Sequence, residues 1–163
     1  MSTRAQIVVK GNEEAKIYKH SDGYPDGVMP VLTELLQQFI AERGNDPEYC
    51  TAQIIRAFAR DNEEHRIKQL EHFEKEISIL TANKQEASFY KTLKESYSKP
   101  SMLSWGVSND WYLDIEYFYY VDLEKETVDI CSPNDAFDED PKLENMELIQ
   151  RVKIVQKPEL KLV

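Results

Sequence analysis

The stretch IYKHSDGYPDG at residues 17–27 marks the point where a strand pattern gives way to a helix pattern. Before it, residues 6–10 form a short β-branched run, and residues 15–20 match a partner strand after a polar tip, which predicts a β-hairpin. After it, apolar residues in 28–43 recur on one helical face, which predicts a helix. The two glycines and the proline of the stretch indicate a tight connection between these elements.

Two further helical patterns follow. Pro47 is suited to the first position of a second helix, where proline loses no hydrogen bond. Apolar residues then recur over 67–80 at spacings of 3, 3, 4 and 3, close to a heptad seam, and residues 85–97 carry another apolar face. Residues 61–97 are therefore predicted as an inserted helical hairpin. A capping-box pattern near residue 61 leaves open whether a new helix begins there or the earlier one continues.

The strongest strand pattern is WYLDIEYFYYV at residues 111–121. Alternation predicts a core face made of Trp111, Leu113, Ile115, Tyr117, Tyr119 and Val121. The opposite face would carry Tyr112, Asp114, Glu116, Phe118 and Tyr120. Residues 127–131 predict its hairpin partner and 152–155 a last strand, whereas 98–108 indicate a loop and 133–147 an acidic surface segment.

This order of elements predicts an α+β fold with a single domain over residues 1–163. We expect a mostly antiparallel sheet of about four to five strands with helices packed on one face, plus the helical insertion. The second face of the sheet would then mix aromatic with acidic side chains. A solvent-exposed face without a binding role would carry fewer aromatic residues, and a buried face would carry fewer acidic residues.

The net charge of −10 is unevenly distributed along the chain. Residues 1–109 carry 16 acids and 14 bases, whereas residues 110–150 carry 13 acids against two lysines. Such a field opposes binding to phosphate backbones, so direct nucleic-acid binding is disfavoured. A basic protein partner, or mimicry of nucleic acid, is compatible with it.

The sequence contains no apolar run of membrane-spanning length and no secretory leader pattern at its N-terminus. Cys50 and Cys131 form no metal or redox motif, and two lone thiols are typical of a reducing compartment. These observations predict a cytoplasmic protein without membrane attachment.

Two motifs carry a family resemblance: the stretch at residues 17–27 and the later DIEYFY at 114–119. They resemble an uncharacterised family of small phage and prokaryotic proteins that pairs an IYxHxDGYPxG box with a DxEYxY strand. The similarity covers about residues 2–60 and 105–131. It brings no known activity to this chain, but its phage association favours an accessory or counter-defence role.

The candidate binding residues come from these two motifs: Tyr18, Lys19, His20, Asp22, Tyr24, Tyr112, Asp114, Glu116 and Phe118. A histidine beside a carboxylate can act as a general base, and two strand carboxylates can share a cation. Tight-turn chemistry explains the same Asp and Gly residues without any activity. Because no P-loop, GxSxG or HExxH motif occurs, we predict no metal and no cofactor, and the motifs leave the catalytic residues of an enzyme unidentified.

Three hypotheses for the function follow. The leading one is a non-enzymatic binding protein that acts through a protein partner or a sequestered ligand. The second is a nucleotide-like ligand-binding or hydrolytic protein with a site around His20 and Asp22. The third is a structural protein that forms homo-oligomers through its aromatic sheet face.

Overall fold

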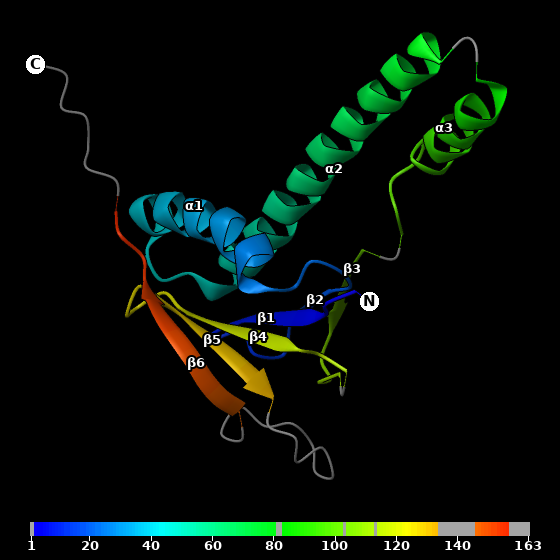
Figure 1. Ribbon diagram of the computed structural model, residues 1–163. Coiled ribbons are helices and arrows are strands. Elements are labelled where there is room, and N and C mark those ends of the chain that lie inside the picture. Colours follow the sequence, from blue (N-terminus) through cyan, green and yellow to red (C-terminus); the bar gives the residue numbers. More distant parts are fainter. Residues whose placement is uncertain (1, 81–82, 103, 113, 134–145, 157–163) are drawn as a thin grey trace, which may run out of the picture. The chain divides into compact units, whose positions relative to one another are not determined.

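The computed structural model describes residues 2–80, 83–102, 104–112, 114–133 and 146–156. It divides the chain into two compact units (Figure 1). The first unit comprises Met1–Ala57 and Leu103–Val163, and the second comprises Phe58–Met102. The second unit therefore contains the residues predicted as a helical insertion.

A six-stranded sheet with the order β3-β2-β1-β4-β5-β6 forms the base of the first unit. The strands are β1 (Ala5–Val9), β2 (Lys16–Lys19), β3 (Trp105–Ser108), β4 (Tyr117–Asp122), β5 (Thr127–Pro133) and β6 (Met146–Lys153). Neighbouring strands are antiparallel except for β1 and β4, which run parallel. The α+β class is confirmed.

The sheet differs from the expected one in two ways. It is mixed, because β1 and β4 pair in parallel, and it has six strands instead of four to five. The additional strand is β3, in the stretch 98–108 that indicated a loop. β3 becomes a strand by pairing with β2, with Tyr18 opposite Gly106, which is a tertiary contact that no local pattern signals.

β1 lies near the middle of the sheet, and all five of its side chains are buried. Ile7 lies opposite Ile17 of β2 and Tyr119 of β4, on the face of the sheet that the helices cover. Gln6 and Val8 point to the other face, which we call the helix-free face (Figure 1). The side chains on both faces of β1 are therefore buried in the protein interior.

Helix α1 (Pro25–Arg43) covers the first face (Figure 1). Its buried residues recur every three to four positions: Val28, Leu32, Leu36 and Phe39. The helix starts three residues before the predicted Val28, because Pro25 can occupy its first turn and the carbonyl oxygen of Tyr24 accepts hydrogen bonds from the next turn. It ends at Gly44, whose φ of 67° is the left-handed value that glycine tolerates.

The helix-free face has a small core of its own, made of Val8, Ile115, Phe118 and Cys131. The predicted strand 111–121 is wrong in its first half, because only Tyr117–Asp122 forms β4. The preceding loop lies across the helix-free face and packs Ile115 and Trp111 against Phe118. Phe118 is consequently fully buried, and Leu113 lies outside the described residues.

Helix α2 (Pro47–Ile79) runs without a break past residue 61, so the earlier helix continues there. In the second unit, its later part and α3 (Lys84–Ser96) form the helical hairpin. Phe73 of α2 is 5% exposed, and its ring centroid lies 5.3 Å from that of Tyr97. The Arg66 guanidinium also donates a 2.8 Å hydrogen bond to the Tyr97 carbonyl oxygen.

None of the described helices is long and apolar enough to cross a membrane. The predicted acidic segment 133–147 lies mostly outside the described residues.

Candidate functional site

The stretch 17–27 is a structural corner, and its glycines are required by close packing. A Cβ atom on Gly23 would lie 2.8 Å from Cβ of Ala5, and one on Gly27 would lie 2.5 Å from the Asp22 carbonyl oxygen. The Gly23 amide donates a 2.9 Å hydrogen bond to the Thr3 carbonyl oxygen. The turn is therefore pressed against the start of β1.

This corner separates the candidate residues that the sequence placed together. Lys19 lies on the helix-covered face and is 5% exposed. Its Nζ atom donates a 2.5 Å hydrogen bond to the Ser21 carbonyl oxygen and lies 5.1 Å from the Trp105 ring. Asp22 occupies the turn with a φ of 53°, and Tyr24 is the residue that precedes α1.

Tyr18 and His20 lie instead on the helix-free face. The Tyr18 hydroxyl oxygen is 3.1 Å from Nδ1 of His20, and the Tyr18 ring centroid is 4.7 Å from that of Tyr112. Trp111 neighbours Tyr112 in the loop and packs edge-on against the buried Phe118. We call Tyr18, His20, Trp111 and Tyr112 together the aromatic surface.

Two buried polar side chains hold the loop of the aromatic surface in place. Gln6, with no exposed area, donates from Nε2 to the Asp110 carbonyl oxygen at 3.1 Å. Its Oε1 atom accepts a 3.0 Å hydrogen bond from the Tyr112 amide. Both ends of one buried amide therefore fix the backbone on either side of Trp111.

Lys16 supports the same loop from β2. It is 7% exposed, and its Nζ atom donates to the carbonyl oxygens of Glu13 at 2.8 Å and Asn109 at 2.9 Å. The ammonium group also lies 4.9 Å from the centre of the Trp111 ring, which is a cation–π contact. Lys16 and Gln6 were not among the site residues predicted from the sequence, although a glutamine inside the run AQIVV was a detectable signal.

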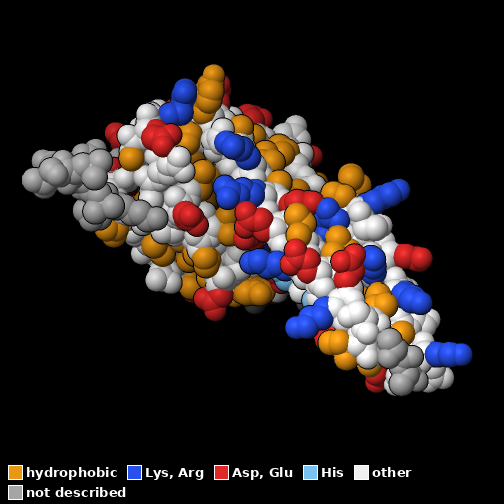
Figure 2. Space-filling view, turned by 90° about the horizontal axis from the view of Figure 1, so that it is seen from above, with side chains coloured by type: hydrophobic (Ala, Val, Ile, Leu, Met, Phe, Trp, Pro, Cys, Tyr) orange, Lys and Arg blue, Asp and Glu red, His pale blue; other side chains and the backbone are white. Residues whose placement is uncertain are grey.

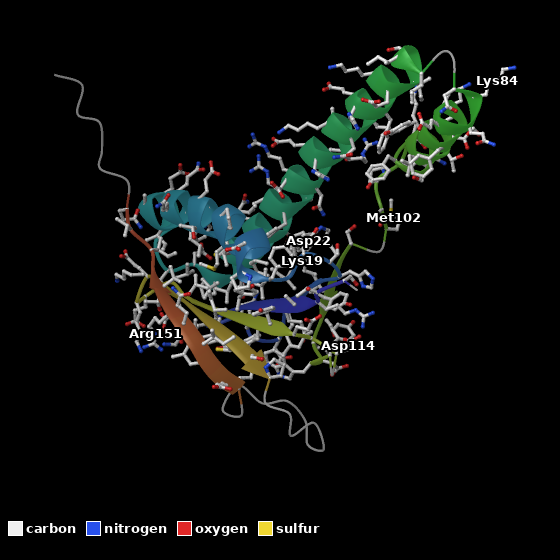
Figure 3. The ribbon with its side chains drawn as sticks, viewed as in Figure 1. Lys19, Asp22, Lys84, Met102, Asp114 and Arg151 are labelled. Carbon is white, nitrogen blue, oxygen red and sulfur yellow. The ribbon has the colours of Figure 1, made fainter. Side chains whose placement is uncertain are left out.

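Asp114 and Glu116 both contact Arg4. The Asp114 carboxylate is ion-paired with the Arg4 guanidinium, and the Glu116 amide donates a 2.9 Å hydrogen bond to the Arg4 carbonyl oxygen. Figure 3 shows Asp114 well apart from Lys19 and Asp22. Within the described ranges, no group of three or more His, Cys, Asp or Glu residues could hold a metal ion.

Acidic groups border the aromatic surface. Asp110 is exposed, and the Glu13 carboxylate accepts a 3.4 Å hydrogen bond from the Tyr120 hydroxyl. A backbone hydrogen bond from Gly11 holds the pKa of Glu13 below its usual value, so this carboxylate is charged at neutral pH. Burial, with the charge of Glu13, raises the pKa of Tyr120 to about 12, so this tyrosine stays a neutral donor.

No protein-family model, curated protein or solved structure matches the chain.

Proposed function

We propose that the protein is a non-enzymatic binding protein that recognises a partner protein through its aromatic surface. The anchoring of Tyr112 by Gln6 supports this proposal most. Tyr112 is 42% exposed, yet its backbone is fixed by a fully buried amide. A pre-ordered loop loses little conformational entropy on binding, and exposed tyrosine and tryptophan residues are common binding hot spots.

The charges around the aromatic surface favour a basic partner. An arginine of the partner could stack on Tyr112 while its guanidinium pairs with the exposed Asp110 carboxylate. Figure 2 draws the side of the molecule that carries the helices, where basic, acidic and hydrophobic side chains are interspersed without a broad field of one sign. On the opposite, helix-free face, recognition would depend on the carboxylates of Asp110 and Glu13, and salt would weaken it over a Debye length of about 8 Å.

The resemblance to a family of phage and prokaryotic proteins favours a counter-defence role for this binding protein. A counter-defence role would place the protein in the host cytoplasm, where its partner would be a host protein. The net charge of −10 would speed association with a basic surface.

A nucleotide-like ligand is the second candidate, because Tyr18, His20 and Tyr112 present ring faces on which a base could stack. Thermal unfolding with a panel of nucleotides tests it. A ligand at 100 times its dissociation constant should stabilise the protein by about 2.7 kcal/mol. A panel without any stabilisation would exclude this candidate.

A photo-crosslinking experiment tests the proposed function. A photoreactive amino acid is placed at Tyr112 in one variant and at Tyr24 in a matched control, since both tyrosines are 42% exposed. In host lysate we expect a salt-sensitive protein adduct from position 112 and none from position 24. Equal labelling at the two positions, or no adduct, would contradict the proposal. An adduct of twice the chain mass would show self-assembly instead.

A further inference from the structure

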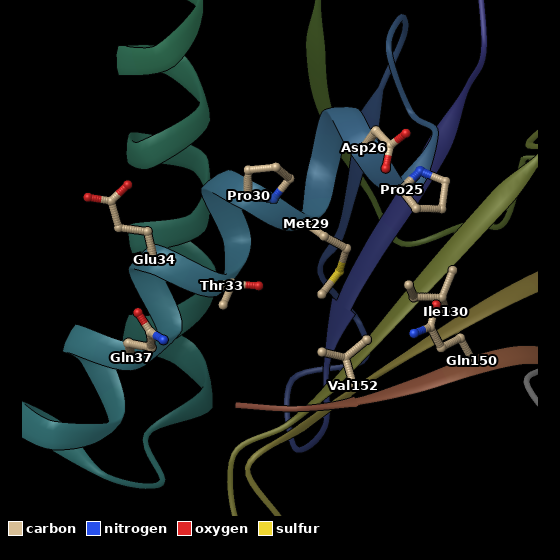
Figure 4. Close-up of a pocket in the computed structure, with 10 residues that line it drawn as sticks. All are labelled: Pro25, Asp26, Met29, Pro30, Thr33, Glu34, Gln37, Ile130, Gln150 and Val152. Atoms are coloured by element: carbon tan, nitrogen blue, oxygen red, sulfur yellow. The ribbon is translucent and has the colours of Figure 1, made fainter. Parts of the chain in front are cut away.

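The two edge strands of the sheet, β6 and β3, are protected to different degrees. β6 carries the charged residues Glu147, Arg151 and Lys153, and its register with β5 shifts once, as at a bulge. Charges and bulges keep an edge strand from pairing with another chain. Figure 4 shows the Met29 side chain of α1 directed toward Val152 of β6, so a helix also lies beside this edge. A strand added at β6 would therefore meet both charges and a helix.

β3 lacks these protections. Its sequence Trp-Gly-Val-Ser contains no charged residue and no proline, and its register with β2 is regular. Val107 lies opposite Ile17, on the helix-covered face of the sheet, yet it is 57% exposed. Within the described part of the chain, no strand pairs with the outer side of β3. Because β3 has four residues, this edge has room for a short segment of another chain.

The backbone groups of Val107 point away from β2. Opposite residues of an antiparallel pair alternate between hydrogen-bonded and non-hydrogen-bonded pairs. The His20 amide donates a 3.1 Å hydrogen bond to the carbonyl oxygen of Ser104, so these two residues form a hydrogen-bonded pair. Two residues further along the register, Gly106 and Tyr18 form the next such pair. The N–H and C=O groups of Val107 are therefore directed to the outer side of β3, where an added strand would bond them.

The position beside the Tyr18 ring is left empty by Gly106. A Cβ atom on Gly106 would lie 3.9 Å from Cβ and from Cδ1 of Tyr18. A large flat side chain on a neighbouring strand packs well over such a glycine. Nearby, the Asp110 amide donates a 2.9 Å hydrogen bond to Oγ of Ser108. Asp110 is exposed, and among the described residues its carboxylate has no ion-pair partner. Arginine combines a flat side chain with the complementary charge.

We propose that the partner protein adds an extended segment to the sheet at β3, with an arginine opposite Gly106. The backbone of the segment bonds the N–H and C=O groups of Val107, and its arginine stacks on Tyr18 and pairs with Asp110. The next side chain of the segment lies beside Val107 on the other face of the sheet. This inference rests on the proposed function, since Tyr18 belongs to the aromatic surface, and it adds the way in which the partner binds.

Three peptides test the hydrogen bonds by nuclear magnetic resonance titration of the labelled full chain. The probe is acetyl-Thr-Val-Arg-Val-Thr-amide. With its arginine opposite Gly106, the two valine amides point toward β3 and the arginine amide points away. Methylation of both valine nitrogens should weaken binding about tenfold, whereas methylation of the arginine nitrogen should change it by less than about twofold. The probe should also shift the Val107 amide signal and slow its hydrogen exchange. Equal binding of the two methylated peptides, or no shift of Val107 at millimolar probe, would overturn the proposal.

Variants of the protein test the same contact from the other side. Val107→Pro removes the outward N–H group, and proline is tolerated where an edge N–H faces solvent, so we expect a folded variant that binds the probe more weakly. Val107→Thr keeps both backbone groups and should bind like the wild type. If Val107→Pro does not fold, the methylated peptides decide the question on the wild-type chain.

The charge pairing has its own control. Glutamine in place of the arginine of the probe should weaken binding to the wild type, and should have a smaller effect on Asp110→Asn, which has already lost the charge. Equal losses in the two proteins would show that the arginine does not pair with Asp110.

Photo-crosslinking at position 112 separates this inference from the proposed function. A partner adduct that persists in Val107→Pro would overturn strand addition at β3 and leave the proposed function in place. Without an adduct in the wild-type background, the proposed function fails, whereas the methylated peptides still decide whether β3 accepts a strand.

Discussion

The hydroxyl group of Tyr119 donates a 2.7 Å hydrogen bond to the carbonyl oxygen of Gly23. This contact joins the central strand β4 to the corner at residues 17–27, across 96 positions of sequence. Burial raises the pKa of Tyr119 far above its usual value, so the hydroxyl keeps its proton and remains a donor at any physiological pH. The corner is therefore tied directly to the core.

Replacing this hydroxyl should destabilise the protein measurably. Tyr119→Phe leaves the Gly23 carbonyl oxygen without its buried donor, so we expect the free energy of unfolding to fall by about 1–3 kcal/mol. Urea denaturation measures it. Tyr117→Phe on the same strand is the control, because its hydroxyl makes no hydrogen bond with a described residue, and an equal loss there would refute the explanation.

The corner should also be intolerant of small additions. In Gly27→Ala the new Cβ would lie 2.5 Å from the Asp22 carbonyl oxygen, so the turn must shift. We expect a loss of about 1–3 kcal/mol in unfolding free energy, as for an overpacked core. Gly106→Ala is the comparison, because its nearest contact would be an ordinary 3.9 Å to Tyr18. Comparable losses in both variants would show that close approach is not the cause.

The aromatic surface should loosen when its buried anchor is removed. Gln6→Met keeps the length of the side chain but removes both hydrogen bonds to the backbone of Asp110 and Tyr112. We expect faster hydrogen exchange at the Tyr112 amide and weaker crosslinking from position 112. Gln37→Met removes one hydrogen bond near α1 and should leave that amide unchanged. Unaltered exchange in Gln6→Met would mean that the loop is held by packing alone.

The buried thiols predict a loss of stability at alkaline pH. Burial raises the pKa of Cys50 to about 12 and that of Cys131 to about 11, whereas an unfolded cysteine titrates near about 8.5. Because the folded pKa values are the higher ones, this stability is complete below pH 8.5 or so and is lost as pH rises toward the folded values. Urea denaturation between neutral and alkaline pH should show the decline. Cys50→Ala should make it shallower, and an unchanged slope would contradict the assignment.

Regular periodicity predicted most of the elements. The apolar stripe of α1 and the heptad-like spacing in 67–80 were sufficient to predict these helices, because residues three and four positions apart are neighbours on a helix. β3 could not be found in this way. Trp105–Ser108 is short and contains Gly106, and it becomes a strand only through its pairing with β2.

The candidate site was harder to predict for a different reason. Alternation in 111–121 cannot distinguish a continuing strand from a loop that leaves the sheet. Here the chain leaves the sheet because the side chains of Gln6 and Lys16 form hydrogen bonds with the backbone of residues 109–112. The carboxylates of Asp114 and Glu116 were consequently expected beside His20. Tyr18, His20 and Tyr112 do lie near one another on the helix-free face, and their role in binding stays a prediction.

The parallel pairing of β1 with β4 has a consequence for how the protein is made. Ala5 lies opposite Tyr117, so the central strand leaves the ribosome more than a hundred residues before its partner. Until then, the nascent chain has Ile7 and Val9 without the β4 neighbours that they meet in the finished sheet. Chaperones that hold emerging apolar segments should therefore associate with this chain until the strand at residues 117–122 has been translated.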